Sequence, residues 1–310
     1  MTTVTPDDFF KIISPFLEEV FLDLPPYHKD EAFHQEVLDQ FTLSGLPEDV
    51  VRASSEAGAV VAECFYPSLK DPLRLSIAVW TAYIFSLDNI CTDASFRDQM
   101  KSYRSVFFGQ STDLKFLNGL YTSLEDLSKY YDTFAGDMIM KSVLDYVSIN
   151  ILEEEQKERK DDFMLSSSTS MFPDFLRQKS AIGEAYAFLN FPGSWNVASY
   201  FPLIPDMAAI VDRLNDVVSF YKESVLGNEA GTLVRQTCVC LGVSEYEAIE
   251  IRAAQCLDCI QRLRGACQGD VKLLKRVNEF IQGYALYHLC LDRYKLNDFG
   301  NYEAWFGGEK

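Results

Sequence analysis

Residues 205–226 read PDMAAIVDRLNDVVSFYKESVL, and apolar side chains recur in this stretch every three or four residues. This is the spacing of an amphipathic α-helix, in which successive residues turn by about 100°. Pro205 suits the first turn of such a helix, because its missing N–H would have no partner there. The stretch therefore predicts one long helix from Pro205 to Leu226.

Three oxygen-bearing side chains follow each other at intervals of four residues in this predicted helix. Asn215, Ser219 and Glu223 fall within an arc of roughly 80° on one face of an ideal helix. A carboxamide, a hydroxyl and a carboxylate are hard oxygen donors, which suit Mg²⁺ rather than Zn²⁺ or copper. Three such ligands would leave half an octahedron for water and phosphate oxygens. The alternative is an ordinary polar face of an amphipathic helix, with Lys222 pairing nearby.

The same helical period dominates the rest of the chain, and few segments alternate as strands do. A chain of 310 residues can bury one large core or two ordinary ones. No repeat and no linker divides it, so we expect about ten helices around one core, a single domain over residues 1–310. The clearest predicted helices are Val50–Phe65, Pro72–Leu87, Lys115–Tyr131, Asp137–Glu158, Pro173–Leu189, Pro205–Leu226, Glu245–Gln268 and Val271–Leu296.

Composition excludes several classes of function. The chain has 28 Lys and Arg against 46 Asp and Glu, a formal charge of −18, which disfavours a general nucleic-acid or anionic-membrane surface. No stretch approaches ~18 uncharged apolar residues, and the N-terminus lacks a signal-peptide pattern. We therefore expect a cytoplasmic protein without stable membrane insertion. The eight cysteines, including the pair Cys256 and Cys259, are expected to be reduced thiols.

The motif NDVVSFYKE, residues 215–223, resembles the metal-binding triad motif of class I terpene synthases, and its SFYKE part is most similar to the fungal trichodiene-synthase-like group. The resemblance implies an all-α, single-domain helical bundle with a central active-site cavity. It also implies a lyase of fungal secondary metabolism that breaks a carbon–oxygen bond of an isoprenoid diphosphate. A homodimer is common among proteins that this chain resembles.

A second acidic segment lies 215 − 88 = 127 residues upstream, where WTAYIFSLDNICTD ends an aromatic helix. It resembles the aspartate-rich motif of the family, usually DDxxD, with Asn89 in place of the second aspartate. The resemblance makes Asp88 a metal ligand. Asp93 lies about 140° around an ideal helix from Asp88, so it could join Asp88 as a ligand only if the helix ends between them. Its alternative role is to cap the following helix.

Two metal-ligand clusters imply an anionic substrate, and arginine donates to phosphate oxygens through two N–H groups at once. The stretch FPDFLRQKSAIGEAYAF resembles the pyrophosphate-sensor segment of the family, with Arg177 as the sensor. The stretch YHLCLDRYKL resembles its paired Arg–Tyr element, which implies that Arg293 and Tyr294 contact the diphosphate. Asp292 would orient the arginine, and Lys222 is a further candidate donor.

By this resemblance, three Mg²⁺ ions, two at Asp88 and one at the triad, would clamp an allylic diphosphate while its C–O bond breaks. Preorganised cations favour that ionisation because negative charge grows on the leaving group. The remaining allyl cation needs a dry cavity, whose aromatic faces attract positive charge. Core packing is the alternative for each candidate wall residue. These residues are Phe65, Trp80, Tyr83, Phe85, Phe188, Trp195 and Tyr287.

The implied reaction converts farnesyl diphosphate to a cyclic sesquiterpene. We favour a humulene-type product over bisabolyl or trichodiene-type products, because no residue obviously positions a second ring closure. A linear prenyl diphosphate synthase is the first alternative, but it would need a second aspartate-rich motif where residues 212–223 carry the Ser/Glu pattern. A non-catalytic helical binding protein is the second, and it leaves both ligand clusters and the arginines as coincidences.

The C-terminal tail, residues 297–310, is aromatic and contains glycine. We expect it to fold over the mouth of the site when metal ions and diphosphate bind, as mobile lids do. Limited proteolysis with Mg²⁺ and diphosphate should then cleave the tail more slowly than proteolysis without them. Equal cleavage under both conditions would contradict the lid.

Overall fold

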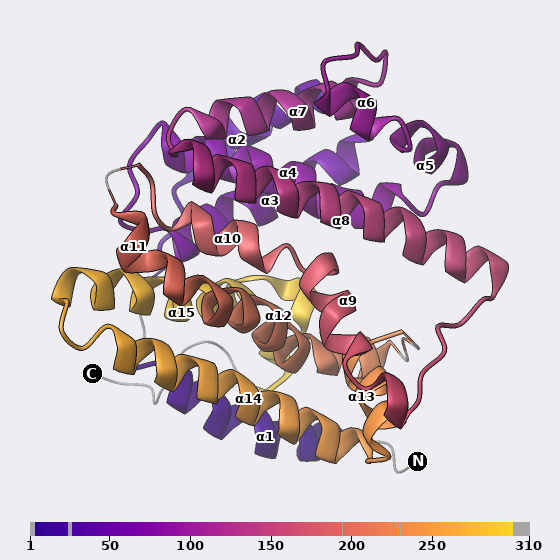
Figure 1. Cartoon of the computed structure of the whole chain (residues 1–310), viewed down its shortest axis with the longest axis vertical. Helices are drawn as coiled ribbons and strands as arrows, with labels where there is room; N and C mark the ends of the chain where they lie inside the picture. Colours follow the sequence, from indigo (N-terminus) through magenta and orange to yellow (C-terminus); the bar gives the residue numbers. More distant parts are fainter. Residues whose placement is uncertain (1–3, 24–26, 194, 228, 230, 300–310) are drawn as a thin grey trace. The chain divides into compact units, whose positions relative to one another are not determined.

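The computed structural model describes residues 4–23, 27–193, 195–227, 229 and 231–299, without the side chain of Asn297. Its regular elements are helices, and the described part of the chain contains no strand. The all-α class predicted from the helical period is therefore confirmed. The α-helices are numbered α1 to α15 and the shorter turns η1 to η6, as in Figure 1.

The helices are divided between two compact units. Unit 1 comprises residues 1–26, 163–184 and 200–310, and unit 2 comprises residues 27–162 and 185–199. Each unit is built from separate stretches of the chain, so no single linker segment separates the two units in the sequence. The assignment of residues 1–310 to a single domain stays a prediction.

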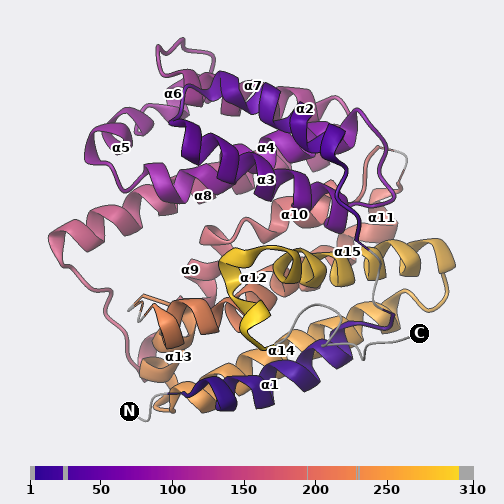
Figure 2. The ribbon, with the colours of Figure 1, turned by 180° about the vertical axis from the view of Figure 1, so that it is seen from behind.

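In unit 2, α3 (Glu48–Phe65) and α4 (Leu73–Ile90) pack closely and lie side by side in both Figure 1 and Figure 2. Gly58 of α3 makes this approach possible, since a Cβ there would lie 2.3 Å from the carbonyl oxygen of Ala78 on α4. The other helices of unit 2 are α2 (Glu31–Phe41), α5 (Ala94–Met100), α6 (Tyr103–Phe107), α7 (Lys115–Ser128), α8 (Thr133–Arg159), α10 (Gly183–Leu189), which begins in unit 1, and α11 (Val197–Tyr200), which ends there.

Helix α4 is buried on most of its circumference, because it packs on α2, α3, α7 and α8. Trp80 is fully buried in it, and Tyr83 packs edge-on against Phe41 of α2 at 4.8 Å between ring centroids. The helix ends at Ile90, after which the chain turns toward α5. Asp88 and Asn89 are the exposed residues in the last turn of this otherwise buried helix.

In unit 1, α12 (Ile204–Phe220) packs along α14 (Glu245–Ala266). Helix α1 (Pro6–Val20) packs on α14 and on α15 (Val271–Cys290), and Figures 1 and 2 both show α1 beside α14. Ser244 and Glu247 start α14 with a capping box, in which each side chain accepts from the other residue's backbone N–H. The remaining helices of unit 1 are α9 (Phe172–Ser180) and α13 (Leu233–Leu241).

The predicted helix Pro173–Leu189 is wrong, because two helices, α9 and α10, cover this stretch. The chain breaks between them at Ile182, whose φ of 54° is a left-handed conformation that β-branched residues rarely adopt. The following Gly183 packs directly on α12, and a Cβ there would lie 2.6 Å from the carbonyl oxygen of Ala208. The close contact with α12 accounts for the break, and apolar periodicity alone did not predict it.

The predicted helix Val271–Leu296 is too long. Helix α15 ends at Cys290, and two 3₁₀ turns follow, η5 (Asp292–Tyr294) and η6 (Leu296–Phe299). Tyr294 is 3% exposed, and its hydroxyl lies 2.6 Å from that of Tyr287, so the turn folds this side chain back onto α15. Of the lid predicted at 297–310, residues 300–310 lie outside the described residues.

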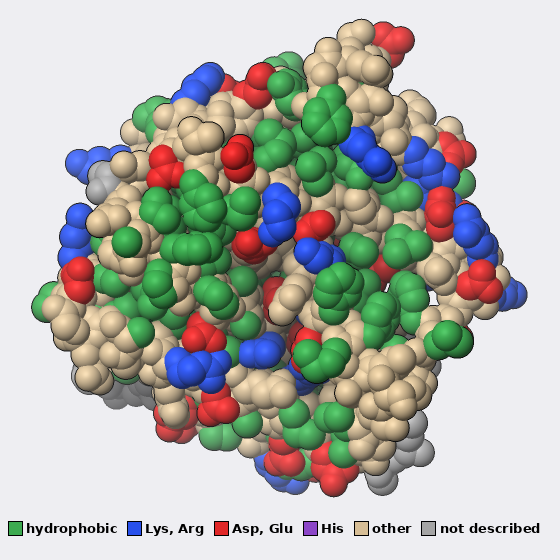
Figure 3. Space-filling model, in the orientation of Figure 1, with side chains coloured by type: hydrophobic (Ala, Val, Ile, Leu, Met, Phe, Trp, Pro, Cys, Tyr) green, Lys and Arg blue, Asp and Glu red, His purple; other side chains and the backbone are tan. Residues whose placement is uncertain are grey.

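Some charged side chains on the surface are paired with opposite charges. Lys and Arg lie beside Asp and Glu at several places on the face shown in Figure 3. Examples are Arg262 with Asp206 at 2.6 Å and Lys129 with Asp126 at 2.5 Å. Among the described helices, none is long and apolar enough to cross a membrane. The eight cysteines are free thiols, as the sequence predicted.

The Gly58→Ala variant tests the close packing of α3 on α4. The added methyl group would meet the backbone of α4, so we expect the free energy of unfolding to fall by about 1–3 kcal/mol. Gly136 of α8 is the matched control, because nothing lies within 4 Å of its built Cβ. Gly136→Ala should raise stability by up to about 1 kcal/mol. Urea unfolding measures both, and an unchanged midpoint for Gly58→Ala would contradict the packing.

Candidate active site

The helix that carries the predicted triad changes type along its length, which corrects the prediction of one continuous α-helix. It is α-helical to Phe220 and continues as the π-helix η4 (Tyr221–Leu226). Asn215 and Ser219 lie in the α-helical part and Glu223 in the π-helix. Four residues on an α-helix overshoot a full turn by about 40°. The wider turn of a π-helix offsets this drift for Glu223, and π-helical segments are frequent at functional sites.

Asn215 is held from two sides. Its Oδ1 accepts a hydrogen bond from Arg177 Nη2 at 2.7 Å, and its Nδ2 lies 3.2 Å from His288 Nε2. His288 Nδ1 lies 2.7 Å from the carbonyl oxygen of Tyr284, which can only accept, so Nδ1 carries the ring proton. Nε2 must then accept from the Asn215 amide, which fixes the orientation of the carboxamide.

Ser219 offers a buried oxygen on the same helix. Its side chain is 1% exposed, and within the described residues its Oγ has no hydrogen-bond partner. The same holds for Oδ2 of Asp216. A buried hydroxyl without a partner costs roughly 1–3 kcal/mol, so such groups in native proteins commonly serve a ligand or an ion. Together with an amide oxygen and a carboxylate, this hydroxyl fits a hard divalent cation such as Mg²⁺.

No three His, Cys, Asp or Glu side chains in the described part of the chain are placed to hold a metal ion. The triad differs from such a group because an amide and a hydroxyl supply two of its three donors. Its third donor is Glu223, whose Oε1 lies 3.3 Å from Lys222 Nζ. Both side chains are about three-quarters buried. The triad is therefore close to a cation of the protein before any metal ion binds.

Tyr221, the first residue of the π-helix, connects it to the C-terminal turn η6. Its hydroxyl donates to Asp298 Oδ2 at 3.1 Å, and its ring packs on Phe299 at 4.5 Å between centroids. Phe9 of α1 contacts both rings. The residues that lead into the tail therefore start beside Tyr221 of the π-helix.

Arg177 contacts α12 from α9. Its Nε lies 2.9 Å from Asp216 Oδ1 in an ion pair, in addition to its hydrogen bond to Asn215. Helix α9 is itself held by Asp174, which pairs with the buried Arg252 of α14. Arg252 also donates to Thr237 of α13 at 2.7 Å. The position of the predicted sensor arginine thus depends on contacts with α12, α13 and α14.

Burial controls the charges around Arg177. Burial lowers the pKa of Arg177, but the carboxylates of Asp216 and Asp212 outweigh this and hold its pKa above the usual value. Burial raises the pKa of Asp216 to about 6 and that of Asp212 to about 8, although Arg177 opposes both shifts. Asp216 is the carboxyl that pairs directly with Arg177, and Asp212 holds its proton to a higher pH than Asp216 does.

His288 lies within a group of tyrosines at the end of α15. Its ring centroid lies 4.6 Å from that of Tyr284, 4.5 Å from Tyr287 and 4.4 Å from Tyr294. Arg293 places its guanidinium carbon 5.4 Å from the centroid of the Tyr294 ring. The predicted Arg–Tyr pair is therefore adjacent to the histidine that bonds Asn215.

The predicted diphosphate donors of unit 1 also act on this histidine. Burial, together with the positive charges of Arg293, Arg177 and Lys222, lowers the pKa of His288 to about 3. These three cations come from η5, α9 and the π-helix. Each of them therefore acts electrostatically on His288 and favours its neutral form.

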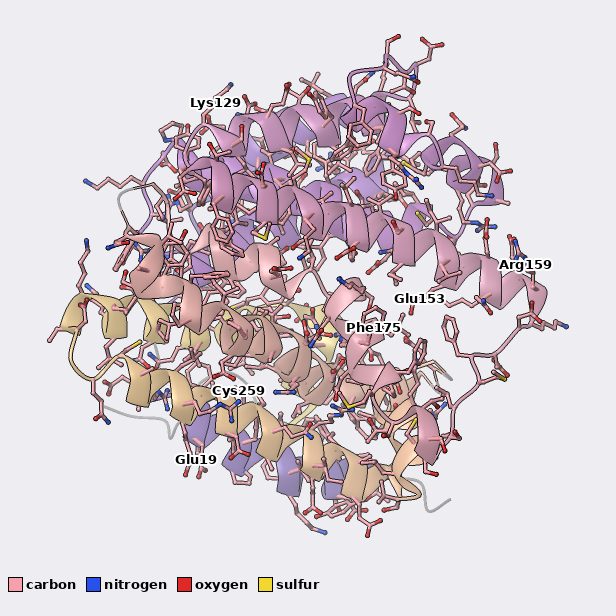
Figure 4. The ribbon with its side chains drawn as sticks, viewed as in Figure 1. Glu19, Lys129, Glu153, Arg159, Phe175 and Cys259 are labelled. Atoms are coloured by element: carbon pink, nitrogen blue, oxygen red, sulfur yellow. The ribbon has the colours of Figure 1, made fainter. Side chains whose placement is uncertain are left out.

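In unit 2, Asp88 has a buried partner on α8. The hydroxyl of Tyr146, which is 5% exposed, donates to Asp88 Oδ1 at 2.8 Å and lies 3.2 Å from the carbonyl oxygen of Ile84. Burial and the nearby Asp88 raise the pKa of Tyr146 well above its ordinary value. Helix α8 also carries Glu153 and Arg159, which are labelled in Figure 4.

Lys157 adds a positive charge to this part of α8. Burial lowers its pKa, but the hydrogen bond from Lys157 to Glu154 and the charges of Glu153 and Asp88 outweigh that effect and raise it.

Asp93 has another role in the structure, because it caps α5 and accepts a hydrogen bond from the backbone N–H of Phe96 at 2.7 Å. The helix does end between Asp88 and Asp93, but the role of Asp93 as a metal ligand stays a prediction.

The predicted wall residues fall into separate aromatic groups, and all except Tyr287 belong to unit 2. Phe65 and Trp80 both pack on Tyr186 of α10, at 5.7 and 5.4 Å between centroids. Tyr83 lies instead among α2, α4 and α7, where burial raises its pKa to about 12. Phe188 packs on Phe134, Trp195 packs on Phe191, and Phe85 is half-buried. Their place in a cavity wall stays a prediction.

Sequence reasoning missed three residues with central positions: His288, Tyr146 and Asp216. His288 is one of three histidines in the chain and interrupts an apolar helix, which is a usable signal. Tyr146 and Asp216 carried no comparable signal, because a tyrosine and an aspartate in an amphipathic helix are common. Their partners became known only from the folded chain.

Solved structures of terpene synthases share this fold. A linalool/nerolidol synthase from Streptomyces clavuligerus covers 86% of this chain and all of its own, with a TM-score of 0.66 at 11% identity. The same synthase in complex with 2-fluorogeranyl diphosphate gives 0.64 at 12% identity, over 83% of this chain and 97% of its own. An α-eudesmol synthase matches with a TM-score of 0.63 at 12% identity, over 87% of this chain and 98% of its own.

The fold, the family match and the curated relatives together define a class I terpene synthase, a lyase. The chain belongs to the trichodiene synthase family, whose model matches residues 26–305. An (E)-β-farnesene synthase from Metarhizium brunneum is 25% identical over 285 residues, 89% of this chain and 84% of that protein. A longiborneol synthase from Gibberella zeae is 26% identical over 301 residues, 93% and 87%. The family predicted from NDVVSFYKE is confirmed.

The raised pKa of Asp212 gives a pH dependence that can be measured without metal ions. Between about pH 4 and 8, the folded state keeps a proton that an ordinary carboxyl with a pKa of 3.8 releases, so the free energy of unfolding falls as the pH rises. Asp212→Asn cannot titrate, and its stability relative to wild type should rise over this window. Urea midpoints measure this difference.

The exposed Asp258 of α14 provides the matched control, since Asp258→Asn makes the same chemical change in solvent. Its stability relative to wild type should stay constant with pH. Parallel pH curves for Asp212→Asn and wild type would show that Asp212 is ionised in the folded protein.

Proposed function

We propose that this chain is a Mg²⁺-dependent sesquiterpene cyclase that converts farnesyl diphosphate to inorganic diphosphate and a cyclic sesquiterpene. The observation that carries the proposal is the α12–η4 face, with the oriented amide of Asn215, the buried Ser219 hydroxyl and Glu223. Two relatives are named for C15 products, farnesene and longiborneol. Because farnesene is acyclic, ring closure is part of the proposal.

Asn215, Ser219 and Glu223 would hold one divalent cation through three oxygens, and Asp88 would hold others. Bound Mg²⁺ supplies positive charge that neutralises the leaving diphosphate. Tyr146 keeps one Asp88 oxygen in a fixed hydrogen bond. A total of three ions follows the family resemblance, with Asp93 as a further candidate ligand.

Arg177, Lys222 and Arg293, together with the hydroxyl of Tyr294, would donate hydrogen bonds to the diphosphate oxygens. Support comes from unit 1, where the charges of all three basic residues act on the buried His288. A guanidinium has five N–H donors, and Arg177 gives one to Asn215, whereas its Nε forms an ion pair with Asp216 without a hydrogen bond. Donors aimed at the leaving group favour bond cleavage more than substrate binding, because the negative charge is largest in the transition state.

The hydrocarbon part of the substrate requires apolar surroundings. Phe65, Trp80 and Tyr186 form one aromatic cluster in unit 2 that could face a carbocation. We favour a humulene-type ring over bisabolyl-derived products, and we also propose a cytoplasmic homodimer that binds no nucleic acid. The two alternatives, a linear prenyl diphosphate synthase and a non-catalytic binding protein, are tested by the same product analysis.

Incubation with farnesyl diphosphate, with Mg²⁺ or with EDTA, followed by gas chromatography and mass spectrometry of the extract, tests the reaction. We expect a metal-dependent cyclic C15 hydrocarbon or alcohol, and less turnover of the C10 and C20 diphosphates. A longer prenyl diphosphate formed with isopentenyl diphosphate would support the synthase alternative. No product from C10, C15 or C20 substrates would overturn the cyclase proposal.

Glu223→Gln and Asn215→Leu test the triad. Asn215→Leu removes one oxygen donor to the cation, and Glu223→Gln removes the negative charge of another, so we expect kcat/KM to fall by at least about 100-fold while helical content stays the same. Glu250→Gln in α14 makes the same change at an exposed position and should keep wild-type activity. Near-normal turnover in either triad variant would contradict the metal assignment.

A further inference from the structure

His288 is a buried polar residue that the proposed function does not use. It is fully buried in α15 and hydrogen-bonds Asn215 on α12. We propose that His288 is a positioning residue, which orients the Asn215 carboxamide so that its oxygen is presented to the divalent cation. This inference rests on the proposed role of the Asn215/Ser219/Glu223 triad.

The ring proton of His288 decides the direction of each hydrogen bond. The carbonyl oxygen of Tyr284, 2.7 Å from Nδ1, requires the ring proton on Nδ1. Nε2 can then only accept, and the group it meets at 3.2 Å is the Asn215 amide nitrogen. Arg177 Nη2 is a donor at the other end of the carboxamide, 2.7 Å from Oδ1.

Only one orientation of the Asn215 carboxamide satisfies both of its hydrogen-bond partners. The two ends of a carboxamide have nearly the same size, but only the oxygen can bind a cation. A flipped Asn215 would oppose its NH₂ to the Arg177 donor and its oxygen to the His288 acceptor, so both hydrogen bonds would be lost. The two partners therefore accept one orientation.

His288 and Arg177 contact different atoms of Asn215. A cation bound by Asn215 uses Oδ1, the atom that Arg177 contacts, whereas His288 contacts the amide nitrogen. His288 can therefore hold Asn215 both before and after a cation binds. Nε2 is engaged by Asn215 and Nδ1 carries the proton, so the ring is not placed to act as a general base.

The His288 ring is held rigidly by its aromatic neighbours. Tyr284, Tyr287 and Tyr294 surround it at 4.4–4.6 Å between centroids, and the hydroxyls of Tyr287 and Tyr294 lie 2.6 Å apart. Tyr294 is also a proposed diphosphate contact. Asn215, the proposed metal ligand, and Tyr294, the proposed diphosphate contact, therefore both contact the His288 ring.

Binding of Mn²⁺, a paramagnetic substitute for Mg²⁺, in the presence of inorganic diphosphate tests the proposal on the full chain without turnover. Electron paramagnetic resonance of free Mn²⁺ gives the dissociation constant. His288→Phe keeps an aromatic ring among the tyrosines but removes the acceptor. His288→Gln restores an acceptor oxygen near the position of Nε2.

The control is His34→Phe, because His34 of α2 is also a buried histidine, 8% exposed, whose Nε2 contacts Glu63 at 3.0 Å. We expect His288→Phe to weaken Mn²⁺ binding about 10–100-fold, the usual range for residues that orient a metal ligand. His288→Gln should recover most of the affinity. His34→Phe should lower the thermal midpoint and leave Mn²⁺ affinity unchanged.

Three results would overturn the proposal. Wild-type affinity in His288→Phe is the first, and a loss of affinity in His288→Phe that only matches its loss of folded protein is the second. The third is equal loss in His288→Gln and His288→Phe.

Asn215→Leu distinguishes a failure of the triad assignment from a failure of the positioning role of His288. If it binds Mn²⁺ like wild type, the triad itself is wrong and the role of His288 falls with it. If it loses affinity while His288→Phe does not, only the positioning role is overturned.

Discussion

The buried guanidinium of Arg177 is the constraint on which the ligand-bearing part of unit 1 depends. A charge taken out of water must be paired and hydrogen-bonded, because an unpaired buried charge costs several kcal/mol. Arg177 meets this requirement through Asp216 and Asn215 of α12. Helix α9 must therefore lie against α12, and the ion pair between Asp174 and the buried Arg252 of α14 also holds α9.

The same constraint helps to explain the chemistry of the triad. Helix α12 already buries Asp212 and Asp216, and burial raises the pKa of both. Further carboxylates on this helix would add repulsion in a region of low dielectric. Two neutral donors, Asn215 and Ser219, give oxygen ligands without that additional charge. The third donor, Glu223, is less buried and lies beside Lys222.

The amino-acid pattern predicted most of the long helices and the family, because apolar periodicity and the NDVVSFYKE motif are local in sequence. The errors occurred where distant contacts decide the backbone. Apolar periodicity continues through Ile182, yet the packing of Gly183 on α12 breaks the helix there. It also continues past Cys290, but the contact of Tyr294 with Tyr287 turns the chain back. A change from α to π geometry at Tyr221 leaves no mark in hydrophobic spacing.

The sequence by itself determined which residues can supply oxygen ligands and cationic donors, since side-chain chemistry and local spacing are written in it directly. Tertiary structure alone decided how those groups are oriented. Neither the tautomer of His288, nor the direction of the Asn215 carboxamide, nor the hydrogen bond from Tyr146 to Asp88 could be read from spacing. The His288 tautomer follows from the backbone carbonyl of Tyr284, and the other two features each depend on two side chains separated by tens of residues. Burial then fixes their protonation and hydrogen bonding, because unpaired polar groups are costly away from water.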